Sequence, residues 1–136
     1  MLRAAAFALL LLAAGAAAAQ DMDPALAAAL GPAPVASYWL PDPGNREAVG
    51  VTYTEIEGAA GNVNINVGYF AGGPQGFALA GPVLELYGEN PRDPRFLEDR
   101  IELTTTMPNP GDPRCCPTGT AVWSIDRQTL AARRIQ

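Results

Sequence analysis

Two stretches of strict alternation between apolar and polar side chains constrain the fold of this chain more than any other feature. Apolar side chains occupy every second position from Val63 to Tyr69, and an asparagine directly precedes each of the first three. Residues 100–107 alternate in the same way. A period of two puts the apolar side chains on one face of a strand, whereas a helix needs a period of 3.6. Both stretches are therefore predicted to be half-exposed β-strands.

Turn-forming sequences separate further short strands at intervals of roughly ten residues. Strands are predicted over 35–40, 48–56, 77–87 and 130–135, and around Trp123. Gly81 and Pro82 interrupt one of them and indicate a bulge or an edge strand, because proline donates no ladder hydrogen bond. The polar segment 88–95, with its Asn-Pro and Asp-Pro pairs, is predicted to be a loop. The expected fold is mainly β, an antiparallel meander of five to seven short strands with one short N-terminal helix; the alternative is α+β.

The inward-facing positions of these strands predict the hydrophobic core. Each member is an apolar side chain on the face that its strand would turn away from solvent. The predicted core contains Val49, Val51, Val63, Ile65, Val67, Leu79, Ile101, Leu103, Trp123 and Ile125.

The first residues are typical of a secretory signal peptide. Arg3 is the only charge before Asp21, an apolar stretch follows it, and small alanines precede Gln20. The predicted organisation is a signal peptide over 1–19, a short helix and proline-rich leader over 20–34, and a single β-rich domain over 35–136. Cleavage before Gln20 would leave no stable membrane anchor and place the protein in the periplasm or outside the cell.

The charged residues argue against several classes of function. The formal net charge is −5, which disfavours a nucleic-acid partner because phosphate binding needs a basic surface. The chain has no histidine and no lysine, which excludes Ser-His-Asp and Cys-His catalysis, histidine-bound metals and Schiff-base chemistry. Neither a catalytic constellation nor a cofactor or metal site is expected, so the protein is predicted not to be an enzyme.

The most distinctive segment is a loop that contains both cysteines of the chain, Cys115 and Cys116, with Asp112, Arg114 and Pro117 beside them. Adjacent thiols rarely stay reduced in an oxidising compartment. Three outcomes are open: a disulfide between the two neighbours, bridges between two chains, or a reduced pair that binds a soft metal. We expect the two cysteines to be oxidised to each other in a tight turn.

A resemblance rests on the same loop. Residues 112–118, followed by 121–126, resemble the D-P-x-C-C-P segment of LppP/LprE-type lipoproteins and of related uncharacterised bacterial envelope proteins. Residues 42–49 are similar in outline to a turn of that family, but Asn45 and Arg46 stand where the family has acidic residues and glycine. The lipid-attachment cysteine is also missing. The resemblance implies an envelope protein of unassigned activity, and it supplies no catalytic residues.

These observations favour an exported, non-catalytic domain that binds a partner protein, a glycan or a small ligand. The alternative is a small thiol–disulfide-active protein that uses Cys115 and Cys116. The spacing of these cysteines differs from the C-x-x-C of the usual oxidoreductases.

Overall fold

The computed structural model describes residues 23–31 and 34–136. The expected signal peptide and its cleavage site lie outside these residues. The described chain forms one helix and eight strands. In order they are α1 (Pro24–Leu30), β1 (Ala36–Pro41), β2 (Glu47–Glu55), β3 (Val63–Gly73), β4 (Gly76–Pro82), β5 (Glu89–Phe96), β6 (Arg100–Met107), β7 (Gly119–Asp126) and β8 (Ala132–Arg134).

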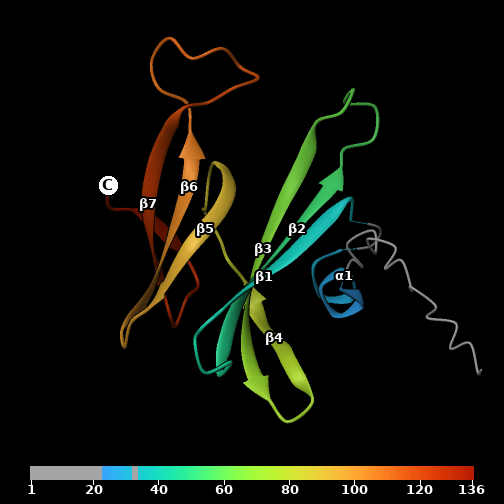
Figure 1. The fold of residues 1–136 in the computed structure, drawn as a ribbon, viewed down its shortest axis with the longest axis vertical. Coiled ribbons are helices and arrows are strands. Elements are labelled where there is room, and N and C mark those ends of the chain that lie inside the picture. Colours follow the sequence, from blue (N-terminus) through green and yellow to red (C-terminus); the bar gives the residue numbers. More distant parts are fainter. Residues whose placement is uncertain (1–22, 32–33) are drawn as a thin grey trace, which may run out of the picture.

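The strands form two four-stranded antiparallel sheets, each a simple meander. The first has the order β1-β2-β3-β4 and the second the order β5-β6-β7-β8. Figure 1 shows the sheets facing each other and diverging toward the end that carries the β2–β3 and β6–β7 connections. The mainly β, antiparallel prediction is confirmed, with eight strands among the described residues in place of five to seven.

The additional strand is β5, and here the loop predicted over 88–95 is wrong. Pro91 and Pro94 suggest a loop, but β5 is an edge strand, where a missing N–H can face away from the ladder. Its pairing with β6 shifts register twice, and Asn90 and Asp93 have positive φ angles of 50° and 52°. Such bulges let a strand with turn-like sequence stay in a sheet.

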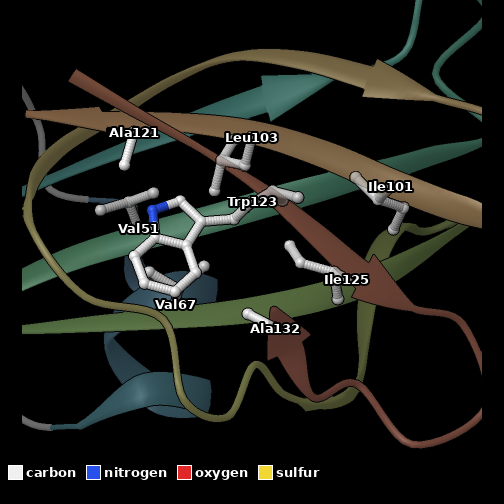
Figure 2. Packing of buried hydrophobic residues seen from close by; sticks show 9 residues of the cluster. Val51, Val67, Ile101, Leu103, Ala121, Trp123, Ile125 and Ala132 are labelled. Carbon is white, nitrogen blue, oxygen red and sulfur yellow. The ribbon is translucent and has the colours of Figure 1, made fainter. Parts of the chain in front are cut away.

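The hydrophobic core fills the space between the sheets. Figure 2 shows Val51 and Val67 of the first sheet facing Trp123 and Leu103 of the second. The buried indole N–H of Trp123 donates to the Thr105 hydroxyl (2.7 Å), so this polar group is satisfied. Of the ten predicted core residues, seven are buried: Val49, Val51, Val67, Ile101, Leu103, Trp123 and Ile125.

The other three core predictions need correction in part or in whole. Ile65 is partly buried and packs against the cluster. Val63 and Leu79, however, are 38% and 40% exposed. Val63 begins β3 where the sheets diverge, and Leu79 lies in β4 at the border of the first sheet. The Leu79 side chain lies on the helix-covered face, near Gly68, and not between the sheets. Alternation predicts which side chains share a face, but it does not show which layer covers that face or how far that layer extends.

Helix α1 lies within the segment 20–34, where a short helix was expected, and it covers the other face of the first sheet. The Asp23 side chain caps it by accepting from the backbone N–H of Ala25 (2.9 Å), and Gly31 follows its last turn. Asp23 also accepts a hydrogen bond from the indole of Trp39, which fixes the helix to β1. Leu26 is fully buried over Gly50, a position where any larger residue would collide with it.

Two polar links join the sheets. At one, the Tyr38 hydroxyl in β1 donates to the carbonyl oxygen of Pro91 in β5 (2.7 Å). At the other, the Arg127 guanidinium donates to both carboxylate oxygens of Glu47 at 2.7 and 2.8 Å. The Tyr69 hydroxyl donates to the same carboxylate (2.6 Å). These links and the core fix the relative placement of the two sheets.

Candidate functional site

The two cysteines lie in the loop that joins β6 to β7. Residues 108–118 form this loop, and it projects from the end of the second sheet, as Figure 1 shows in orange. Its ends are held together because Met107 pairs with Gly119 in the last register position of the two strands. The strands therefore present the loop at the end where the two sheets diverge.

The carboxylate of Asp112 closes the base of this loop. It accepts from the backbone N–H groups of Asn109 (2.7 Å) and Thr118 (2.8 Å) and from the Thr118 hydroxyl. The backbone N–H groups of Thr118 and then Asn109 hold the pKa of Asp112 below its ordinary value. Asp112, expected only to flank the site, is thus the residue that organises it.

Cys115 and Cys116 are exposed at the tip, with their sulfur atoms at disulfide-bonding distance. The N–H of Cys116 donates to the carbonyl of Pro113 (3.1 Å), so the pair lies within a tight turn. Of the three outcomes that the sequence left open, the structure has the bond between neighbours. The cysteines present an exposed sulfur surface beside Arg114.

A depression of about 340 Å³ lies at the base of the loop. Apolar groups from Met107, Pro108 and Pro117 line it, and Arg114 and Asp112 add charges of opposite sign. Its far wall is formed by Gly88 and Glu89, at the beginning of β5. The depression is therefore bounded by the loop and by an edge strand.

A second depression, also of about 340 Å³, begins on the other side of Glu89. Tyr53, Val63 and Ile65 of the first sheet line it, together with residues 61–62 of the β2–β3 connection and Asn90. Because Glu89 lines both depressions, they are neighbours at the open end of the sandwich. We call the two depressions together the mouth, defined by the residues that line them.

The charges at the mouth are available to a ligand. Among the residues that the structure describes, neither Glu89 nor Arg114 forms an ion pair. Tyr38, whose hydroxyl is bonded to Pro91 next to Asn90, has its pKa raised by burial and by the neighbouring Tyr53, so it remains protonated. The mouth thus combines apolar walls with one exposed carboxylate and one exposed guanidinium.

A larger depression, of about 520 Å³, lies on the outer face of the second sheet. Three of its four charged side chains have partners: Asp99 pairs with Arg100 (2.9 Å), and Asp126 accepts from the backbone N–H groups of residues 128 and 129. Arg133 is the fourth. Glu102, on the same face, is covered by ion pairs with Arg95 and Arg100. This face is therefore largely a salt-bridged surface, and the mouth is the better candidate.

In the turn over residues 42–49, the one buried carboxylate is already hydrogen-bonded by groups of the same turn. Asp42 is buried, and its carboxylate accepts from the backbone N–H and the guanidinium of Arg46 and from the N–H of Glu47. Burial acts to raise the pKa of Asp42, but these hydrogen bonds outweigh it and leave the pKa lowered. The turn itself thus supplies the hydrogen-bond donors of the Asp42 carboxylate.

Sequence reasoning found the loop and its flanking residues but missed the opposite wall. The alternation predicts Val63 and Ile65 in the core, and the pattern places Tyr53 within the strand 48–56 and Glu89 within the loop 88–95. A usable signal was present in Val63 and Ile65, which are apolar residues at the beginning of a strand next to the glycine-rich turn 58–61. Only the divergence of the sheets brings them to the same end as the cysteines.

Within residues 23–31 and 34–136, no helix has the length and apolar character needed to cross a membrane, and no group of three or more potential metal-binding side chains occurs. No family model matches the chain, and no match was found among curated proteins or solved structures. The function is therefore inferred from the geometry and chemistry of the mouth.

Proposed function

We propose that this protein is exported and acts outside the cytoplasm as a non-catalytic binding domain whose ligand lies in the mouth. The observation that carries the proposal is that two neighbouring depressions, one at the base of the Cys115–Cys116 loop and one lined by the first sheet, share the lining residue Glu89. Each has the size of a small ligand pocket, and together they suit an elongated ligand.

The lining favours a short extended segment of a partner protein. Such a segment carries apolar side chains, which the walls around Met107 and Ile65 would bury, and it offers backbone amides and charges to Glu89 and Arg114. The loop is pre-organised by Asp112, so binding would cost little ordering entropy. A glycan is the other ligand class that the test below examines.

The test uses a library of random dodecapeptides displayed on phage, selected on the folded domain without its signal peptide. Selected peptides are synthesised and titrated by calorimetry against the wild type and the variants Met107→Asp and Val63→Asp. We expect each variant to weaken binding at least about tenfold, since a charge replaces an apolar contact. Ile135→Asp, at an apolar residue 47% exposed outside the mouth, is the matched control.

Two results would contradict the proposal. Selected peptides that bind the Met107→Asp and Val63→Asp variants as tightly as the wild type would place the ligand elsewhere. A glycan array in which sugars bind, and lose binding in the same two variants, while no peptide is enriched, would replace the peptide ligand by a glycan. Circular dichroism of each variant separates a local effect from loss of the fold.

The exposure of both cysteines supports a second candidate, thiol–disulfide exchange. An incoming thiolate would attack one sulfur, a mixed disulfide would form, and the other cysteine would leave as a thiolate. Mass spectrometry after incubation with reduced glutathione tests this directly. A glutathione mixed disulfide on one of the two cysteines, together with reduction of a reporter disulfide by the protein and glutathione, would support exchange. An unchanged Cys115–Cys116 bond would exclude it.

A further inference from the structure

The outer edge of β4 is unpaired, and the register shift and Pro82 of this strand come after Leu79, which leaves residues 77–79 as a regular edge. β4 is the last strand of the first sheet and pairs with β3, and none of the strands described pairs with its other side. Figure 1 shows the β3–β4 hairpin extending beyond the strands of the second sheet. A strand in this position presents a row of N–H and C=O groups that can template another strand.

The other sheet edges carry features that discourage such pairing. β5 contains two prolines, two register shifts and three charged residues within 89–93. β8 has only three residues, of which two are arginines. β1 is held to β5 by the bond from Tyr38 to Pro91. Short strands, charges, prolines and bulges are the usual protections of edge strands.

β4 lacks charge altogether, as does its surrounding segment. No charged side chain occurs in residues 58–84, which include all of β3 and β4. Ala78 and Ala80 are exposed, and Leu79 is 40% exposed. Because the whole chain carries a net charge of −5, two copies repel least where they meet at this uncharged hairpin.

The direction of the free backbone groups can be deduced from a single hydrogen bond. The N–H of Gly72 donates to the carbonyl of Arg46, on the β2 side of β3 (2.8 Å). Gly72 is opposite Phe77 in the β3–β4 register, so these two do not exchange hydrogen bonds. Phe77 and Leu79 therefore turn their N–H and C=O groups outward, while Ala78 bonds to β3.

We propose that two copies of this chain pair antiparallel through β4, about a two-fold axis at Ala78. In this register Phe77 of each copy lies opposite Leu79 of the other, and both positions direct their backbone groups outward, so four N–H···O bonds can form. Ala78 lies opposite its own counterpart. Pro82 is outside the paired residues 77–79, so its missing N–H costs nothing.

The side chains agree with this register. Phe77 packs against Trp39 on the helix-covered face, with ring centroids 4.9 Å apart. Leu79 lies on the same face, because a Cβ added to Gly68 would contact both Leu79 and Leu30 of helix α1. Phe77 and Leu79 thus share a face, and the pairing forms two symmetric apolar cross-strand contacts. The pairing uses the β4 edge of both copies. The assembly therefore stops at a dimer, and no further copies can add through β4.

The dimer is tested by sedimentation velocity of the folded domain from micromolar to millimolar concentration. We expect a concentration-dependent dimer, and Leu79→Lys should weaken it at least about tenfold by placing a charge opposite each Phe77. Ile56→Lys is the matched control, because Ile56 is 38% exposed and lies outside β4. A monomer at every concentration, or a dimer equally stable in Leu79→Lys, would overturn the proposal.

Cross-linking tests the register independently of any loss of folding. In a background with Cys115 and Cys116 replaced by serine, Ala78→Cys should form an intermolecular disulfide under mild oxidation, because residue 78 faces itself in a close pair. Ala80→Cys in the same background should form it much more slowly. Equal cross-linking of the two variants would refute this register. Because residues 78–80 do not line the mouth, absence of the dimer leaves the proposed binding function unaffected.

Discussion

Replacing Arg127 by alanine would remove most of the polar link between the two sheets. The guanidinium donates twice to Glu47, in β2, and once to the carbonyl of Leu97 (2.8 Å), after β5. The side chains of Arg127 and Glu47 are 24% and 16% exposed, so both charges are largely removed from water. The variant leaves the Glu47 carboxylate with one side-chain donor, the Tyr69 hydroxyl.

The magnitude follows from the number and burial of these bonds. Breaking a fully buried ion pair costs about 3–5 kcal/mol, and a surface pair contributes at most about 1 kcal/mol. With this partial exposure we expect Arg127→Ala to lower the free energy of unfolding by about 2–3 kcal/mol. Glu47→Gln removes the negative charge of the same ion pair. Together with the double variant, the two single variants form a double-mutant cycle, in which we expect a coupling free energy of about 1.5 kcal/mol between Arg127 and Glu47.

The assay is urea unfolding followed by tryptophan fluorescence, since Trp123 is only 5% exposed and reports on the core. All four proteins of the cycle are compared at the same pH, and a common m-value shows that the unfolded state is unchanged. A coupling energy below about 0.5 kcal/mol would show that Arg127 and Glu47 do not act as a pair. The argument for a polar link between the sheets would then fail.

The same pair predicts a pH dependence. Arg127 above all, with help from Tyr69 and against the effect of burial, lowers the pKa of Glu47 from its ordinary value of 4.5. A carboxylate with a lowered folded-state pKa stabilises the protein fully above its unfolded pKa and loses this effect as the pH falls through the folded value. The stability difference between wild type and Glu47→Gln should therefore be constant above about pH 5 and shrink below pH 4.5.

Two further predictions concern the helix-covered face and the cysteine loop. Gly50→Ala should lower stability by about 1–3 kcal/mol in thermal unfolding, because the new Cβ would lie 2.7 Å from Phe70 and closer still to Leu26. Gly73→Ala should have little effect, because its Cβ would only make an ordinary contact, 3.8 Å from the carbonyl oxygen of Gly76. Equal effects of the two substitutions would contradict tight packing under α1. Replacing Cys115 and Cys116 by serine should cost at most about 1 kcal/mol, since a bond between neighbours closes almost no loop, yet it should weaken peptide binding at the mouth. A large loss of thermal stability in that double variant would show that the disulfide supports the fold.

Several local features were predictable because neighbouring residues encode them. The alternation around Val63–Tyr69 and over 100–107 specifies strands, and Asp23, Pro24 and Gly31 specify the beginning and end of α1. These signals act over a few residues, through side-chain direction and backbone hydrogen bonding. They remain valid whichever elements meet later.

Where a local signal conflicts with a position in a sheet, the sheet prevails. Pro91 and Pro94 favour a loop locally, yet the segment is a strand because an edge position and two bulges accommodate the missing donors. Leu79 is apolar and was expected in the core, yet its side chain lies on the helix-covered face, where it stays 40% exposed. The sequence pattern contains no information on the extent of a neighbouring layer.

The sequence by itself therefore determined the antiparallel β class, the helix and its caps, the isolated cysteine pair and the absence of histidine and lysine chemistry. Tertiary structure alone decided which strands meet, and so placed Glu89 between the cysteine loop and the first sheet, and joined Glu47 to Arg127 across eighty positions of sequence. The physical reason is the distance along the chain over which each interaction acts. Periodicity and helix capping depend on residues close together in sequence. The mouth, the ion pair between the sheets and the exposure of the β4 edge depend on how two folded layers pack.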